Sequence, residues 1–180
     1  AEGRNEYSQQ IHAGGRVSNI RSLYGALADL SLNFTKENTA TAVVTGYDLH
    51  ELKDRYEKPD LPARILLPME EYNAFNGGVQ EMMNAGSAGI GGEMMWNVID
   101  LFLLQRTGQG IGLLDFLPDL VRYAGNYTEV MLDNRRPATN IELMSFSPVI
   151  GVYEFPAGSD VTYYGVECQL NFRELINPGG

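Results

Sequence analysis

The sequence predicts an α+β domain: a mainly antiparallel β-sheet with two helices packed on it, and a long flexible arm inserted between two strands. Three observations predict this class. Residues 94–106 form the most apolar run and carry apolar side chains on both parities, which is typical of a strand inside a sheet. Residues 140–155 and 161–175 flank a turn-rich link, as the two strands of a hairpin do. Residues 17–30 and 111–132 repeat apolar side chains at spacings of three and four, as amphipathic helices do.

Length and composition suit one domain. The chain has 180 residues, of which 44% are hydrophobic, enough for a real core. Residues 1–16 are polar and glycine-bearing, so we expect a flexible N-terminal arm ahead of a single domain at 17–176. We expect neither a signal peptide nor a membrane span, because no apolar run has the required length or composition. Cys168 is the only cysteine, which excludes an internal disulfide and a zinc site built on thiolates alone.

The charge balance indicates which kinds of partner suit the chain. The formal net charge of −10 argues against general nucleic-acid binding, which rewards clustered lysines and arginines. Ten arginines stand against three lysines. Because arginine is the usual cation of bidentate pairs and of interfaces, this bias favours a protein that makes protein contacts.

The first predicted elements are a helix and a strand. The helix runs from Val17 and fades near Asn33, and Ser18 or Asn19 is a suitable N-cap. Residues 39–46 are short and β-branched, and they predict a strand.

For residues 47–58, the sequence is consistent with either a helix or a loop. Two leucines share a helical face there, but the surrounding charges favour a solvated segment. Pro59 and Pro62 then enforce an extended entry into a second strand at 63–68.

Residues 69–92 are rich in glycine and polar side chains. A structureless connection of this length inside a compact domain is usually functional or disordered. We expect an arm, or a hairpin that becomes ordered only against a partner.

The second helix, 111–132, contains Pro118 and Gly125, so we expect a kink or two pieces. Its apolar positions at helical spacing are Ile111, Leu114, Leu117, Leu120 and Val121, continued by Tyr127 and Val130. In the last strand one parity is apolar, and the other carries Tyr163, Glu167, Gln169 and Arg173. The second parity is predicted to face water or a partner.

Candidate metal chemistry is confined to one acidic segment. His50 lies among Asp48, Glu51, Asp54 and Glu57, and such a set could bind a divalent metal. The spacing matches no metal motif, and cations alternate with the carboxylates. A solvated face is therefore the better interpretation, and we expect no metal site.

Other signatures of catalysis are weak. Residues 86–92, GSAGIGG, superficially resemble a phosphate-binding loop, but a strand follows them and no lysine does. Cys168 alternates with apolar residues and is best explained as a core thiol. Ser145 and Ser147 stand in no nucleophile-elbow context, because G-x-S-x-G is absent. We expect no enzymatic activity and no cofactor.

Three segments, taken in order, read IRSLYGALADL, KPDLPARILLP and YYGVECQLNFREL. Together they resemble the tail-terminator and neck (head–tail joining) proteins of tailed bacteriophages. Asp60-Leu61-Pro62-Ala63 matches a recurring family segment, and the stretch 164–170, YGVECQL, matches the family's closing strand. The resemblance covers roughly residues 20–175.

The resemblance implies a structural virion protein of the tail or neck, made in the host cytoplasm. It would form a ring, expected to be a homohexamer, that caps the tail tube protein and joins it to the neck or connector protein. DNA would only pass through the lumen, without specific binding, and an acidic inner wall would repel its phosphates. Adjacent subunits could share the arm by strand addition or by draping.

Mobile segments that carry methionine suit adaptable interfaces, although core filling is an equally good explanation. Our candidates for subunit-interface residues are Met82, Met83, Ile90, Met94, Tyr163, Glu167, Gln169 and Arg173. Two alternatives stay open. A head-completion or stopper (connector) protein, or part of a phage-derived injection device, fits the same features. A small metal- or ligand-binding α+β enzyme would need the cluster at 48–57 to line a pocket with perturbed carboxylates.

Overall fold

The computed structural model describes residues 20–34, 42–47, 51–68, 92–108 and 110–176. The helices in these ranges are α1 (Ile20–Asp29) and α2 (Leu113–Asp133), with a 3₁₀ turn at Lys58–Asp60. The strands are β1 (Leu32–Phe34), β2 (Ala42–Val44), β3 (Gly46–Tyr47), β4 (Ala63–Pro68), β5 (Gly92–Arg106), β6 (Ile141–Glu154) and β7 (Thr162–Ile176).

Five strands form the main sheet, in the order β3-β4-β5-β7-β6. Only the short β3–β4 pair is parallel, and the other three pairs are antiparallel. β5 is paired on both sides, with β4 and β7, and β7 pairs along its length with both β5 and β6. The predicted α+β class, the interior position of the apolar run and the closing hairpin are all confirmed.

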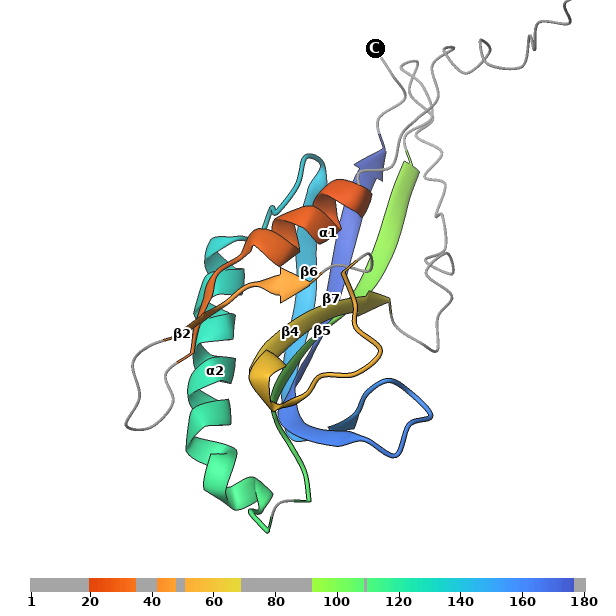
Figure 1. Ribbon diagram of the computed structural model, residues 1–180. Coiled ribbons are helices and arrows are strands. Elements are labelled where there is room, and N and C mark those ends of the chain that lie inside the picture. The colour runs from red at the N-terminus through yellow and green to blue at the C-terminus, as the bar shows by residue number, and fades with distance from the viewer. Residues whose placement is uncertain (1–19, 35–41, 48–50, 69–91, 109, 177–180) are drawn as a thin grey trace, which may run out of the picture.

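The two helices lie on one side of the sheet, which we call the inner face (Figure 1). α1 packs over the β3–β4 side, and α2 packs over β7 and β6. The β1–β2 pair forms a separate two-stranded sheet and contacts α2. This layer buries the larger core cluster, which includes Leu23, Leu27, Phe102, Leu120, Val166, Cys168, Leu170 and Phe172. Burying the apolar face of each element against the next is what makes the layers stable.

The opposite, outer face of the sheet is covered at one end only. Residues 51–61, which we call the strap, pack there over the smaller apolar cluster. Tyr56 of the strap is buried, and its backbone is held by Tyr163 of β7, whose hydroxyl donates to Tyr56 O at 2.9 Å. Within the strap, Lys53 pairs with Asp60. The rest of the outer face has no covering layer in the described part of the chain.

One glycine is required by the register between the central strands. A β-bulge falls between Leu103 and Gln105, and it brings the β5 backbone close to Gly165 of β7. A Cβ atom at Gly165 would lie 2.1 Å from Phe102 O, which no side chain can accommodate. The glycine of the closing-strand segment therefore has a packing function.

Several predicted boundaries differ from those observed. The single strand expected at 39–46 is two short strands, β2 and β3, in the described residues 42–47, and β1 was not predicted. Of the 47–58 segment, residues 51–57 form no helix, so the loop interpretation holds for that part. A kink or two pieces was expected for the second helix; it is not divided in two, because α2 is one continuous helix with Pro118 inside it. The predicted N-cap residues, the arm at 1–16 and nearly all of 69–92 lie outside the described residues.

Candidate interaction surfaces

Helix α2 carries apolar side chains on two of its sides. The side that faces the sheet uses spacings of three and four, and its buried apolar members are Phe116, Leu120, Tyr123, Tyr127 and Met131. The ring of Tyr123 stacks on Phe102 of β5, with centroids 3.8 Å apart. This stripe is the core face of the helix.

The other apolar side of the helix is exposed. It comprises Leu114, Leu117 and Val121, and Ile111, which precedes the N-cap Gly112, is exposed beside it; we call these four residues the α2 stripe. Leu114 is 80% exposed and Val121 is 52% exposed. The sequence predicted helical spacing for these residues and Leu120 alike, but Leu120 is fully buried and these residues are exposed. Successive residues of a helix are about 100° apart around its axis. The exposed residues therefore lie on a different side of α2 from the buried ones.

The α2 stripe points away from the β1–β2 sheet. Asn126 of α2 accepts the backbone N–H of Asn33 in β1 at 3.0 Å, which fixes the side of the helix that faces β1. Leu117 precedes Asn126 by nine residues, or about 180° around the helix. Because α2 lies over β7 and β6, this opposite side is the side of β6, the last strand of the sheet.

β6 is the last strand of the described sheet, and half of its backbone groups point away from β7. Phe155 donates its N–H to Val161 O at 3.0 Å, so odd-numbered residues in the second part of β6 bond to β7. Even-numbered residues, 146–154, direct their N–H and C=O groups away from β7, because antiparallel pairing alternates. We call this stretch the β6 edge. In the described part of the chain, no strand pairs with it.

The two ends of β6 differ in whether other residues cover their outward backbone groups. At its start, Ile141 and Leu143 donate their outward N–H groups to Ala138 O and Arg135 O, which cover the edge. Pro148 then falls among the outward-directed residues, where its missing N–H costs no bond to β7 and blocks pairing locally. Residues 150–154 remain open. Val152 among them is 50% exposed and sits opposite Tyr164, whose hydroxyl donates to Ile111 O at 2.8 Å.

The uncovered part of the outer face carries paired polar side chains beside two exposed apolar ones, Val149 and Leu175. Asn171 of β7 donates to Ser145 of β6 at 2.8 Å, and Gln169 donates to Glu167 at 2.9 Å. Arg173 lies between Glu93 of β5 and Glu142 of β6. The hydrogen bond from Arg173, together with Arg136, lowers the pKa of Glu142. Because each of these polar side chains has a protein partner, the face is ordered without a covering layer.

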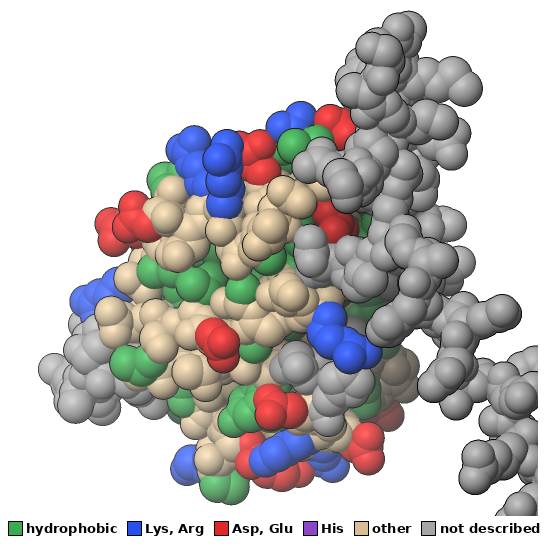
Figure 2. All heavy atoms as spheres, turned by 90° about the horizontal axis from the view of Figure 1, so that it is seen from above, with side chains coloured by type: hydrophobic (Ala, Val, Ile, Leu, Met, Phe, Trp, Pro, Cys, Tyr) green, Lys and Arg blue, Asp and Glu red, His purple; other side chains and the backbone are tan. Residues whose placement is uncertain are grey.

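Charges of both signs are mixed at the upper end of the molecule. Figure 2 shows Lys and Arg side chains beside Asp and Glu side chains on this end, with apolar and uncharged atoms between them. Arg136 and Glu142, which form an ion pair, belong to this end. The described side chains here form no basic patch of the kind that holds a nucleic-acid backbone.

A buried ionic network holds the inner layer in place. Arg64 of β4 donates through Nε and Nη2 to the carboxylate of Asp100 in β5, and through Nη1 to Leu30 O at 2.9 Å. Tyr127 of α2 donates to the same carboxylate at 2.9 Å. Both charged side chains are fully buried. The network thus joins β4, β5, α2 and the end of α1.

The network was missed from the sequence, although a signal existed. Arg64 is the one charge of β4, and Asp100 interrupts the apolar run 98–104 of β5. Buried charges are almost always paired. Burial disfavours the Arg64 cation, but the charge and hydrogen bonds of Asp100 outweigh it and raise the pKa. Burial also raises the pKa of Tyr127 and of the Cys168 thiol. These groups stay in their ordinary protonation states at neutral pH, which suits a structural part.

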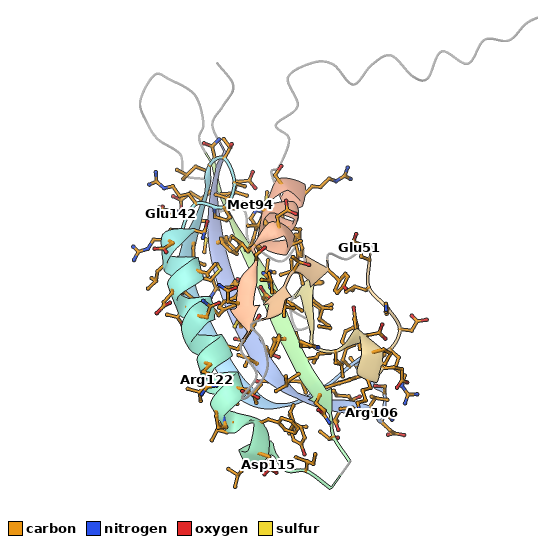
Figure 3. The ribbon with its side chains drawn as sticks, turned by 60° about the vertical axis from the view of Figure 1, so that its left-hand side comes forward. Glu51, Met94, Arg106, Asp115, Arg122 and Glu142 are labelled. Atoms are coloured by element: carbon orange, nitrogen blue, oxygen red, sulfur yellow. The ribbon has the colours of Figure 1, made fainter. Side chains whose placement is uncertain are left out.

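The predicted interface residues fall into three groups. Met82, Met83 and Ile90 lie outside the described residues. Met94 is on the inner side of the sheet and packs partly against the large core, near the upper end in Figure 3. Tyr163 is fully buried beneath the strap, so its side chain offers no surface to a neighbour.

Glu167, Gln169 and Arg173 are partly exposed on the outer face, as the strand parity predicts. The α2 stripe and the β6 edge were not predicted as interaction surfaces. The sequence does not identify either surface, because the periodicity of apolar residues gives their spacing but not the direction in which they face.

The acidic segment shows ion pairs in its described part. Arg55 pairs with Glu57, and Lys53 pairs with Asp60, so cations neutralise these carboxylates. Asp48 and His50 lie outside the described residues. Among the residues that the structure describes, no group of three or more His, Cys, Asp or Glu side chains could hold a metal ion.

Comparison with family models, with curated proteins and with solved structures gives no match. Among the described helices, none is long and apolar enough to cross a membrane.

Proposed function

We propose that this chain is a structural assembly protein of a tailed phage: a tail terminator that forms a ring, caps the tail tube and joins it to the neck. The observation that carries the proposal is the exposed α2 stripe. Leu114 and Val121 leave apolar area in water on a helix that is otherwise well packed. Contiguous exposed apolar patches on soluble domains mark contact sites for other proteins.

The arrangement of surfaces supports assembly with like copies. The α2 stripe and the β6 edge lie on one side of the domain, and the short strand β3 ends the sheet on the other side. Two different surfaces on opposite sides suit a heterologous, head-to-tail contact, which closes into a ring when the rotation per subunit allows it. The strap and the Arg64 network hold the domain rigid while such contacts form.

The outer face suits the wall of a passage for DNA. Among the described residues, its uncovered part carries Glu93, Glu142 and Glu167 against one cation, Arg173, beside amides, hydroxyls and the exposed apolar side chains of Val149 and Leu175. Such a surface repels phosphates weakly and offers them no cluster of cations. In the proposed ring, this face lines the lumen, and DNA passes without being bound.

Electron microscopy of the purified chain, alone and mixed with tail tube protein, tests the proposal. We expect closed rings with a central opening, and a density at one end of each tube when the chain is present. A stopper would also form rings but would bind the connector and leave tube ends bare. Discrete monomers in both samples, with tubes of unchanged length and bare ends, would refute the proposal.

A further inference from the structure

The open part of the β6 edge is symmetric about one residue. Its outward N–H groups belong to Ile150, Val152 and Glu154, and no strand pairs with them in the described part of the chain. The next even-numbered positions on either side are Pro148 and Pro156, which have no N–H to donate. Each proline lies four residues from Val152. The stretch that is open to pairing is therefore the same length on both sides of Val152.

A strand that is open over a symmetric stretch can pair with a second copy of itself. If two copies of β6 lie antiparallel about a two-fold axis at Val152, Val152 faces Val152, and Ile150 faces Glu154 of the second copy. Because these residues direct both backbone groups outward, each facing pair exchanges two hydrogen bonds, about six in all. The prolines then fall at the ends of the ladder, where a missing N–H costs no bond.

The charges of this stretch also suit a second copy. Glu154 is the one charged residue between Pro148 and Pro156. In the antiparallel register, the two Glu154 residues are four positions apart along the strands, or about 13 Å. This separation exceeds the Debye length of about 8 Å at physiological salt, so their repulsion is screened. The pair thus avoids like charges directly opposite each other, which destabilise strand pairing.

Apolar side chains gather around the proposed axis. Val152 is 50% exposed on the inner side of the sheet, opposite Tyr164 of β7. The Tyr164 hydroxyl donates to Ile111 O at 2.8 Å, so the start of the α2 stripe lies close to Val152. Leu114, which follows in the first turn of α2, is 80% exposed. Pairing at Val152 would bring the starts of the two stripes together and remove apolar area from water.

We infer that free copies of this chain pair about a two-fold axis at Val152, through the open part of the β6 edge and the start of the α2 stripe. The contact is isologous, because the same residues contribute from both copies. It lies at the lower end of the molecule in Figure 3, where Asp115 marks the first turn of α2.

The pair competes with the proposed ring. The ring uses the α2 stripe for a contact with a different surface, so one copy cannot make both contacts at once. The pair is therefore a storage form that separates when a ring closes, and this part of the inference rests on the proposed function. Specific stable interfaces bury about 1,600 Å², and five paired residues with one end of the stripe offer less. Mass action should favour the weak pair at intermediate concentrations and the larger ring at higher ones.

Cysteine trapping at the axis tests the pair. Val152→Cys places the two thiols in facing positions whose Cα atoms are about 5.5 Å apart, within the range that a disulfide spans. The matched control is Val149→Cys, which is 48% exposed on the same strand but faces Phe155 of the second copy. Both variants keep Cys168, which is fully buried. We expect Val152→Cys to form linked pairs at least about tenfold faster than the control under mild oxidation. Equal rates, or no linked pairs from either variant, would overturn the inference.

A mixture of two chains tests the register. A tagged chain with Ile150→Cys and an untagged chain with Glu154→Cys should cross-link with each other, because these positions face one another across the axis. Neither should cross-link with its own kind. Thermal unfolding verifies that every variant is folded. Self-linked products without the mixed product would overturn the register and with it the two-fold axis at Val152.

The outcomes separate the pair from the ring. If rings form but Val152→Cys links no faster than the control, the pair is wrong and the ring stands. If Val152→Cys links as expected but no ring forms at any concentration or on tail tubes, the pair stands and the proposed function is wrong. The oxidised Val152→Cys pair should form no rings, and reduction should restore them. Rings built from the oxidised pair would show that the two contacts do not compete.

Discussion

The two apolar stripes of α2 are alike in sequence and opposite in surroundings. The stripe through Leu120, Tyr123 and Tyr127 is buried against the sheet, while the α2 stripe through Leu114 and Val121 lies in water. Both repeat at helical spacing. The difference shows that the helix has one side that folds the chain and one side available to a partner, and that hydropathy alone cannot tell them apart.

The buried stripe also links the helix to the ionic network. Tyr127 contributes a ring to the core and a hydroxyl to Asp100. The exposed stripe has no comparable polar contact. Variants on the two stripes should therefore separate stability from assembly.

The largest effect is expected for Tyr127→Ala. The change leaves a cavity in the core and removes one hydrogen-bond donor from a buried carboxylate. We expect a loss of about 3–5 kcal/mol in the free energy of unfolding, measured by urea denaturation. Tyr127→Phe keeps the ring and should cost about 1–3 kcal/mol. Equal losses for the two variants would show that the ring contributes nothing.

The sharpest comparison uses one substitution on both stripes. Leu120→Ala removes a fully buried side chain and should cost about 2–5 kcal/mol. Leu114→Ala makes the same chemical change on the exposed stripe and should change the free energy of unfolding by about 0.5 kcal/mol or less. Denaturation is measured at a concentration where the chain is monomeric. A large loss for Leu114→Ala would mean that the exposed stripe stabilises the fold.

Assembly should respond in the reverse order. The double variant Leu114→Ser with Val121→Ser should fold normally but raise the concentration needed for assembly by at least about tenfold. Sedimentation velocity across a dilution series measures the shift. Polar substitution of Arg122 on the same helix, which is exposed but outside the stripe, is the matched control (Figure 3). An unchanged sedimentation profile for the double variant would place the contact elsewhere.

The smallest effect concerns Cys168. Its pKa is raised by burial, so the folded chain keeps a proton that the unfolded chain releases above the ordinary thiol pKa of about 8.5. The stabilisation is therefore present below pH 8.5 and declines as pH rises, by about 1 kcal/mol per pH unit at first. The pH dependence of the free energy of unfolding is compared between the unaltered chain and Cys168→Ala. The difference isolates the contribution of the Cys168 thiol. Parallel curves for the two chains would contradict it.

The fold was predictable because strand parity and helical spacing are local. β5 lies inside the sheet, as its two apolar parities indicate, and the long hairpin of β6 and β7 follows from alternation and a turn. β1 and β3 are too short for a periodic pattern, and pairing rather than propensity defines them.

The candidate surfaces were harder to predict, because exposure depends on neighbours. Leu117 and Leu120 differ only in the side of the helix they occupy, and the packing of α2 on the sheet decides which is buried. The free groups of the β6 edge appear only once the strand order is known. Tyr163 has the parity of the outer face but lies under the strap, which strand parity does not reveal.

The most direct measurement is the molar mass of the purified chain by light scattering over a concentration series. A self-assembling ring protein with an exposed α2 stripe should show a mass that rises with concentration to a fixed plateau, expected near six times 19.9 kDa. A mass of 19.9 kDa at every concentration would contradict self-assembly through this surface.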